Sequence, residues 1–266
     1  RMNSKKDIKG LEDEFELDLY PRRNVVLVSG KSSRLYDENG KEYIDCAANV
    51  GVSNIGHANQ EVAKAIYEQY MRLANAYGIF YNDVRAFLAQ KLVEIAPGNL
   101  NKVFFCNSGT EAVEAAIKFA RASTGKTEII CAMRAYHGKT FGSLAATWGT
   151  KYQEPFLPML PGFLHVPFNN LEKLESSINE KTAAILLEPI QGEGGVRIGD
   201  KEFFSTIRKL CDSKDILLIM DEVQTGFGRT GKMFACEHLV IPDILCLAKS
   251  IAGGLPMGAV ISNNKI

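Results

Sequence analysis

The stretch Ile216-Leu-Leu-Ile-Met-Asp221-Glu-Val-Gln224 decides the fold class, because an apolar run ends directly on a carboxylate. Similar apolar runs recur along the chain and alternate with helical patterns. The other expected strands are Val103–Cys106, Glu128–Met133, Phe163–Val166, Ala183–Leu187 and Ile244–Ala248. Runs this apolar are typical of strands covered on both faces. The alternation predicts an α/β fold with a mostly parallel central sheet and helices on both faces.

The remaining pattern predicts helices and one hairpin outside this sheet. Helices are expected at 60–74, 83–96, 111–122, 170–179 and 201–213. The alternation around Asn39-Gly40 predicts a hairpin within Arg34–Asp45. Residues 1–20 are charged and predict an irregular or partly helical arm. We therefore expect an N-terminal arm and hairpin at 1–57, followed by a large domain at 58–266.

The last apolar stretch, Ala259–Ser262, predicts a strand with nothing after it to pair or cover it. The chain also opens at Arg1-Met2. These two features favour a clipped chain over a natural terminus.

Composition excludes several classes of protein. The 266 residues carry 31 Lys+Arg and 31 Asp+Glu, a balance that argues against a nucleic-acid partner. No apolar run approaches the roughly 18 residues that span a bilayer, so no membrane association is expected. Six cysteines without Cys-x-x-Cys spacing and four histidines without ligand spacing predict no metal and a reducing, cytoplasmic location.

Ligands of such sheets bind where the strands end, so polar residues at these points are the candidate site. Ser108, Gly109 and Thr110 lie between an expected strand and an Ala-rich helix. The unpaired N–H groups and positive dipole of a helix start suit a phosphate. The spacing of Ser108 and Glu111 also fits a capping box, and the two interpretations are compatible.

The residues at three further strand ends each allow a purely structural and a functional interpretation. Asp221 is either a loop cap or the partner of a cationic ring nitrogen, a magnesium ion or an arginine. Lys249 either extends its head to water or is desolvated enough to attack a carbonyl and form a Schiff base. Tyr136 either packs in the core or lies over a flat ring. Together with the phosphate cradle, these groups are what a pyridoxal phosphate site requires.

Two glycine motifs resemble nucleotide sites only superficially. Gly226–Gly231 matches G-x-G-x-x-G, but it neither follows its strand directly nor opens a helix. Thr124–Thr127 resembles the end of a P-loop, yet it lies at a helix C-terminus, and Ala120 stands where the first glycine is needed.

These residues resemble the class III pyridoxal-phosphate aminotransferases, which have the aspartate aminotransferase fold. The resemblance covers nearly the whole chain, including the segment Gly51–His57. It is carried by Asn107-Ser-Gly-Thr-Glu-Ala112, Tyr136-His-Gly-Lys-Thr140, Leu187-Glu-Pro-Ile-Gln-Gly-Glu-Gly-Gly195, Asp221-Glu-Val-Gln-Thr-Gly226 and Leu247-Ala-Lys-Ser250. Within the family it is most similar to the acetylornithine branch. The stretch Trp148–Phe156 resembles lysine-biosynthesis members that act on a carrier-protein-linked substrate.

The resemblance implies pyridoxal 5'-phosphate as cofactor and assigns a role to each candidate. Lys249 would hold the cofactor covalently and act as the acid and base of the reaction. Asp221 would pair with the pyridine nitrogen, and Gln224 would hydrogen-bond the phenolic oxygen. Tyr136 would stack on the ring. The residues Ser108, Gly109 and Thr110 would bind the phosphate.

The substrate side shows one departure from the family. Lys139 occupies a position that is usually an arginine binding a substrate carboxylate, and lysine lacks the bidentate fork. Glu193 resembles a glutamate that pairs with, or releases, a substrate-binding arginine as the two half-reactions alternate.

By this resemblance, we expect the family's C-terminal small domain to lie beyond residue 266, along with a carboxylate-binding arginine and a phosphate-binding threonine given by a neighbouring subunit. The resemblance implies a homodimer that transfers an amino group between an ornithine- or lysine-like terminal amine and 2-oxoglutarate. Alternatives are another class III ω-aminotransferase such as 4-aminobutyrate aminotransferase, an NAD-dependent oxidoreductase, or a fragment without turnover.

Overall fold

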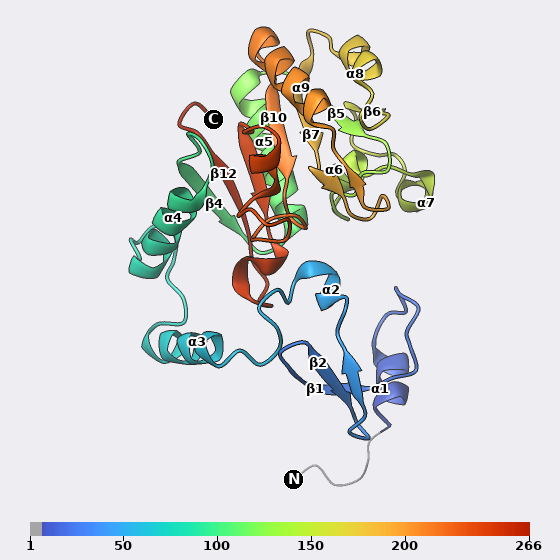
Figure 1. The fold of residues 1–266 in the computed structure, drawn as a ribbon, viewed down its shortest axis with the longest axis vertical. Helices are drawn as coiled ribbons and strands as arrows, with labels where there is room; N and C mark the ends of the chain where they lie inside the picture. The colour runs from blue at the N-terminus through green and yellow to red at the C-terminus, as the bar shows by residue number, and fades with distance from the viewer. Residues whose placement is uncertain (1–6) are drawn as a thin grey trace.

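The computed structural model describes residues 7–266. Its centre is a seven-stranded sheet in the order β4-β12-β11-β10-β7-β5-β6 (Figure 1). The strands are β4 (Lys102–Cys106), β5 (Glu128–Ala132), β6 (Phe163–Val166), β7 (Thr182–Leu187), β10 (Leu217–Asp221), β11 (Ile244–Leu247) and β12 (Gly258–Ser262). All run parallel except β12, which is antiparallel to β11 and β4. The predicted mostly parallel sheet is confirmed.

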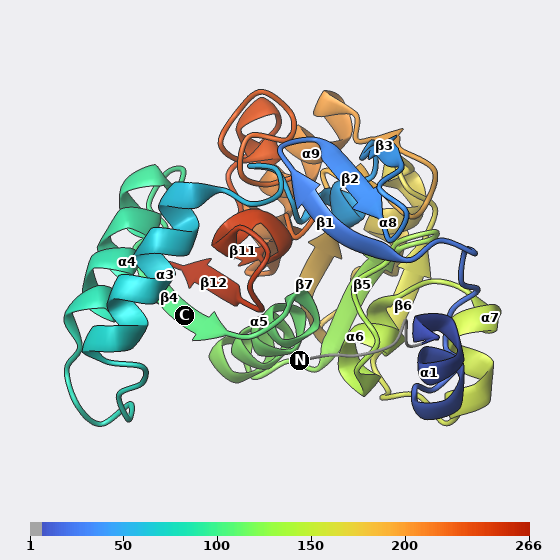
Figure 2. The ribbon, with the colours of Figure 1, turned by 90° about the horizontal axis from the view of Figure 1, so that it is seen from below.

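Helices cover both faces of the sheet because its strands alternate buried side chains between the two. Ile219 packs with the alanine-rich face of α5, whereas Leu218 and Met220 pack with the phenylalanines of α9. Figure 2 shows α5 and α9 on opposite sides of the strands. The helices that follow the N-terminal part of the chain are α3 (Gln60–Arg72), α4 (Asp83–Ile95), α5 (Gly109–Thr124), α6 (Phe141–Ala146), α7 (Thr150–Gln153), α8 (Leu171–Ser177) and α9 (Lys201–Lys214).

The strand predicted at Ala259–Ser262 forms β12, which is fully buried in the interior of the sheet. It pairs with β11 on one side and with β4 on the other. Both partners precede it in the chain, so its cover comes from earlier segments.

The N-terminal part forms a separate small sheet of three antiparallel strands. Its members are β1 (Leu27–Lys31), β2 (Arg34–Asp37) and β3 (Glu42–Ile44). The β2–β3 hairpin turns through Gly40 at φ 78°, as predicted. Figure 1 shows this sheet and the short α2 (Ala48–Gly51) facing the edge where the large strands end.

The expected arm contains α1 (Ile8–Phe15), and its residues 1–6 lie outside the described part. The smaller elements are β8 (Ile190–Gln191), β9 (Arg197–Ile198) and the 3-10 turns η1 (Glu154–Phe156), η2 (Ala235–His238) and η3 (Lys249–Ala252). Among residues 7–266, no helix has the length and apolar character needed to cross a membrane. The boundary at residue 57 remains a prediction.

Candidate functional site

A cavity of about 390 Å³ opens at the carboxyl ends of the large sheet's strands. It is lined by residues that follow β4, β5, β7, β10 and β11, as the topology of such sheets predicts. The structure brings every candidate site residue to this one cavity: Ser108, Gly109, Thr110, Tyr136, Lys139, Glu193, Asp221, Gln224 and Lys249.

The N-terminus of α5 forms one side of the cavity. Ser108 caps the helix, accepting a hydrogen bond from the Glu111 N–H at 3.3 Å. The Glu111 carboxylate reaches back to the Asn107 N–H at 2.8 Å, so the local chemistry is that of a capping box. The helix begins two residues before the predicted start. Its first N–H groups, at Gly109 and Thr110, have no acceptor within the helix and lie at the cavity wall.

Three hydroxyl groups gather beside this helix start. Thr110 Oγ1 lies 2.7 Å from Thr140 Oγ1 and 2.6 Å from Ser143 Oγ. Gly138 passes closely over them with φ 139°, and a Cβ there would lie 2.4 Å from Thr110 Oγ1. Glycine at position 138 therefore keeps the hydroxyl cluster open towards the cavity.

We expect Gly138→Ala to weaken binding of pyridoxal phosphate by at least tenfold and to cost about 1–3 kcal/mol of stability, because the added methyl displaces the Thr110 hydroxyl and strains the backbone. Titration of cofactor absorbance and chemical denaturation measure the two effects. Gly125→Ala is the matched control: Gly125 also has positive φ, but no atom lies near its Cβ position and it ends α5 far from the cavity. Gly138→Ala with unchanged cofactor affinity would contradict this account of the cradle.

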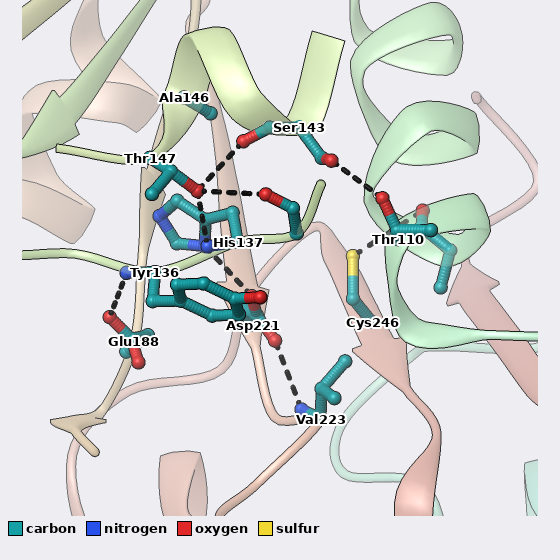
Figure 3. A network of polar contacts seen from close by, with 12 residues as sticks. Thr110, Tyr136, His137, Ser143, Ala146, Thr147, Glu188, Asp221, Val223 and Cys246 are labelled. Carbon is teal, nitrogen blue, oxygen red and sulfur yellow. Dashed lines mark hydrogen bonds and ion pairs between the residues drawn. The ribbon is translucent and has the colours of Figure 1, made fainter. Parts of the chain in front are cut away.

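Asp221 ends β10 as a buried carboxylate, 5% exposed. Its Oδ2 lies 2.7 Å from Nδ1 of the buried His137, and its Oδ1 accepts from the Val223 N–H at 3.0 Å (Figure 3). Burial works to lower the pKa of His137, but the hydrogen bond and charge of Asp221 outweigh it and raise that pKa. The carboxylate is thus held in one orientation beside the cavity.

Lys249 follows β11 and is half-buried. Burial lowers its pKa, while the nearby carboxylates of Asp221, Glu193 and Glu188 oppose the shift. Its backbone φ of 49° is left-handed, a conformation that non-glycine residues hold mainly at functional sites. Half-burial agrees with the desolvated interpretation of this position, and a lowered pKa makes the neutral, nucleophilic amine more accessible.

The other candidates line the same cavity on different sides. The ring of Tyr136 lies edge-on to Tyr152, with centroids 6.0 Å apart. Gln224 sits against Gly192, where a Cβ would overlap its side-chain oxygen. Lys139 is exposed, with its Nζ 4.3 Å from the centre of the Tyr20 ring. Glu193 is also exposed at the cavity wall.

Two cavity residues were missed by the sequence reasoning. His137 lies inside a motif that was recognised, but only its neighbour Tyr136 received a role. Glu188 directly follows the apolar strand β7, which is the same pattern that identified Asp221. Burial raises the pKa of Glu188 to about 7.

Both glycine motifs lie outside this cavity. Gly226–Gly231 forms a loop of turns in which Gly228 and Gly231 have positive φ, and no helix starts there. Gly125 of the P-loop-like stretch is the left-handed cap at the C-terminus of α5. Among residues 7–266, no cluster of side chains could hold a metal ion.

The cavity residues fit pyridoxal phosphate. Its phosphate has a counterpart in the free N–H groups and hydroxyls at the start of α5, and its aldehyde in the desolvated amine of Lys249. Its ring nitrogen has a counterpart in the Asp221 carboxylate, which lines the cavity and is held there by His137. The cavity volume is also of the size typical for small-molecule sites.

Comparison with known proteins agrees with this chemistry. A family model described as "Aminotransferase class-III" matches residues 20–266. Acetylornithine aminotransferase of Methanopyrus kandleri is 47% identical over 98% of this chain and 67% of its own length. The [LysW]-aminoadipate semialdehyde transaminase of Deinococcus radiodurans is 45% identical over 93% of this chain and 58% of its own.

Solved structures show the same fold. The ornithine aminotransferase of Toxoplasma gondii superposes with a TM-score of 0.93 at 32% identity, over 100% of this chain and 65% of that one. A second structure of the same enzyme is described as having partial occupancy of PLP at the active site. The chain thus spans about two thirds of the length of the relatives it resembles. Since the family model covers nearly all of the described residues and the fold and cavity agree with it, the chain belongs to the class III aminotransferase family, whose cofactor is pyridoxal phosphate.

Proposed function

We propose that this protein is a pyridoxal-phosphate-dependent aminotransferase of arginine or lysine biosynthesis. It transfers the terminal amine of an ornithine- or lysine-like substrate, acetylated or linked to a carrier protein, to 2-oxoglutarate. The observation that carries the proposal is the single cavity lined by Lys249, Asp221 and the start of α5. The names of the similar curated proteins support the substrate class.

The cofactor, when bound, supplies an aldehyde that exchanges amino groups and a ring that accepts electrons from the substrate carbon. In this proposal Lys249 holds the cofactor and then moves the proton between substrate and cofactor carbons at its Nζ. Asp221 keeps the ring nitrogen protonated, and His137 orients Asp221 at 2.7 Å. Tyr136 and Gln224 hold the ring in place. The helix start at Gly109 and Thr110 binds the phosphate with Ser108 as its cap.

On the substrate side we assign Lys139 to a carboxylate, in place of the arginine usual in the family. The lysine ammonium is a compact charge and cannot form the two parallel hydrogen bonds of a guanidinium. Its binding of a carboxylate therefore depends mainly on the distance between the two charges. Glu193 also lines the cavity and is exposed. We assign it to pairing with, and releasing, a substrate-binding arginine as the two half-reactions alternate.

We also propose that the enzyme is a homodimer in the cytoplasm. The α3 helix and the segment after it expose many large apolar side chains, a pattern typical of a covered surface. They include Tyr67, Tyr70, Met71, Tyr77, Ile79, Phe80 and Tyr81. All six cysteines are free, which fits a reducing compartment.

The test is a panel of ω-amino donors offered with 2-oxoglutarate to the full-length, cofactor-loaded enzyme, with products read by mass spectrometry. We expect acetylornithine or carrier-linked lysine-type donors to give glutamate at least tenfold faster than 4-aminobutyrate. A preference for 4-aminobutyrate would move the enzyme to another branch of the family. Binding of NAD(P) with hydride transfer, and no glutamate from any donor, would overturn the proposal.

A further inference from the structure

We propose that Glu188 is a positioning residue whose carboxylate joins the backbone of Tyr136 to that of Gly192. It thereby fixes the ring-stacking aromatic and the loop carrying Glu193 relative to each other. The inference rests on the proposed function, because it concerns the residues assigned there to cofactor and substrate. None of the roles assigned above uses Glu188.

The geometry of Glu188 is that of a link between two loops. It follows β7, is 7% exposed, and lines the cavity. Its Oε2 accepts from the Tyr136 N–H at 3.2 Å, and its Oε1 accepts from the Gly192 N–H at 3.4 Å. Figure 3 shows the carboxylate directed at the Tyr136 nitrogen. The two donors belong to loops that leave different strands, so this one side chain bridges them.

A carboxylate is an unusual choice for this link unless its charge matters, because a buried charge is costly. The charged and titratable groups that face it are His137 and Tyr136 after β5, Asp221 at the end of β10, Lys249 after β11 and Glu193 on its own loop. Burial raises the pKa of Glu188 to about 7, with His137 opposing and Asp221 adding to the shift.

It follows that the strength of the link changes near neutral pH. The ionised carboxylate accepts strong hydrogen bonds at both oxygens, whereas the protonated form gives up part of its acceptor capacity. The hydrogen bonds that link the two loops through Glu188 are therefore strongest above about pH 7 and weaker below it. Glu188→Gln keeps the shape but removes the titration, and Glu188→Ala removes the link.

Amide hydrogen exchange tests the link without any turnover. In the cofactor-loaded enzyme, we expect Glu188→Ala to speed exchange at the Tyr136 and Gly192 amides by about tenfold or more, since each loses a charged acceptor. In the wild type, protection of the same amides, corrected for intrinsic rates, should decrease as the pH falls below about 7. In Glu188→Gln it should stay constant over that range.

Kinetics test the consequence for the substrate. We expect Glu188→Gln to raise KM for 2-oxoglutarate by about tenfold while kcat falls less, because the loop with Glu193 is loosened rather than the reacting groups removed. The rise of kcat/KM through about pH 7 should be smaller in the variant. The visible circular dichroism of the bound cofactor should change as the Tyr136 ring shifts.

Glu222→Gln is the matched control. Glu222 is also a buried carboxylate at a strand end with a raised pKa, caused by burial, but it binds the N–H groups of Ala235 and Cys236 and does not line the cavity. The Glu222→Gln substitution should lower thermal stability. It should leave unchanged both the pH dependence of kcat/KM and the hydrogen exchange of the Tyr136 amide.

The outcomes separate the two proposals. A wild type without transamination overturns the proposed function. An active wild type whose Glu188 variants show wild-type exchange, KM and pH profile overturns the positioning role alone. The same holds if Glu222→Gln produces equal shifts, because the effect is then a general loss of stability.

Discussion

Replacement of Lys249 by alanine is expected to lower turnover by about 10³-fold or more and to abolish covalent retention of the cofactor. Lys249 follows β11 and is the half-buried amine of the cavity, with its pKa lowered by burial. The change removes both the attachment point and the group that moves the proton. Borohydride reduction followed by intact mass measures retention, and absorbance of the loaded protein measures the covalent band.

Lys139→Ala is the control for this experiment, since Lys139 lines the same cavity but is exposed and not at a strand end. It should keep the covalent band and the cofactor mass after reduction. If Lys249→Ala still retained the cofactor covalently, the attachment would belong to another residue and the assignment of Lys249 would be wrong.

Asp221→Asn should lower turnover by about 10²–10⁴-fold while the cofactor remains bound, the range seen when one electrostatic or acid–base group is removed. Asparagine keeps the shape and a hydrogen-bonding side chain near His137, but it loses the charge that favours a protonated ring nitrogen. Single-turnover kinetics and cofactor titration measure the two effects separately.

Asp243→Asn serves as the comparison. Asp243 is a carboxylate at the opposite end of β11, where it pairs with Arg208 and accepts from the Leu218 N–H. Its loss should reduce stability and leave the rate per bound cofactor unchanged. Near-normal turnover in Asp221→Asn would mean that another group keeps the ring protonated.

Most of the large sheet could be predicted from the sequence because its strands are short apolar runs that end abruptly. The run before Asp221 and the Ser108–Glu111 spacing are local patterns that act through adjacent backbone. The polar residues that follow each strand could also be predicted to lie at one edge of the sheet, because each is identified by the apolar run directly before it. Parallel strands bring those ends together wherever the intervening helices lie.

The missed features depend on partners far along the chain. The position of β12 depends on its pairing with β4, which lies more than 150 residues earlier in the sequence. The residues of β12 alone do not indicate which strands will flank it. The pairing of His137 with Asp221 joins positions 84 residues apart, and the bond from Tyr136 to Glu188 joins positions 52 apart. A single sequence shows that these side chains are present but does not indicate which of them form contacts.

The central claim is that Lys249, Asp221 and the start of α5 face one and the same small molecule. A crystal structure of the full-length enzyme grown with pyridoxal phosphate tests it most directly. We expect density joined to Lys249 Nζ, with a ring nitrogen at hydrogen-bond distance from Asp221 and a phosphate on the N–H groups of Gly109 and Thr110. A cofactor bound elsewhere, or one that reaches only some of these three points, would contradict the account.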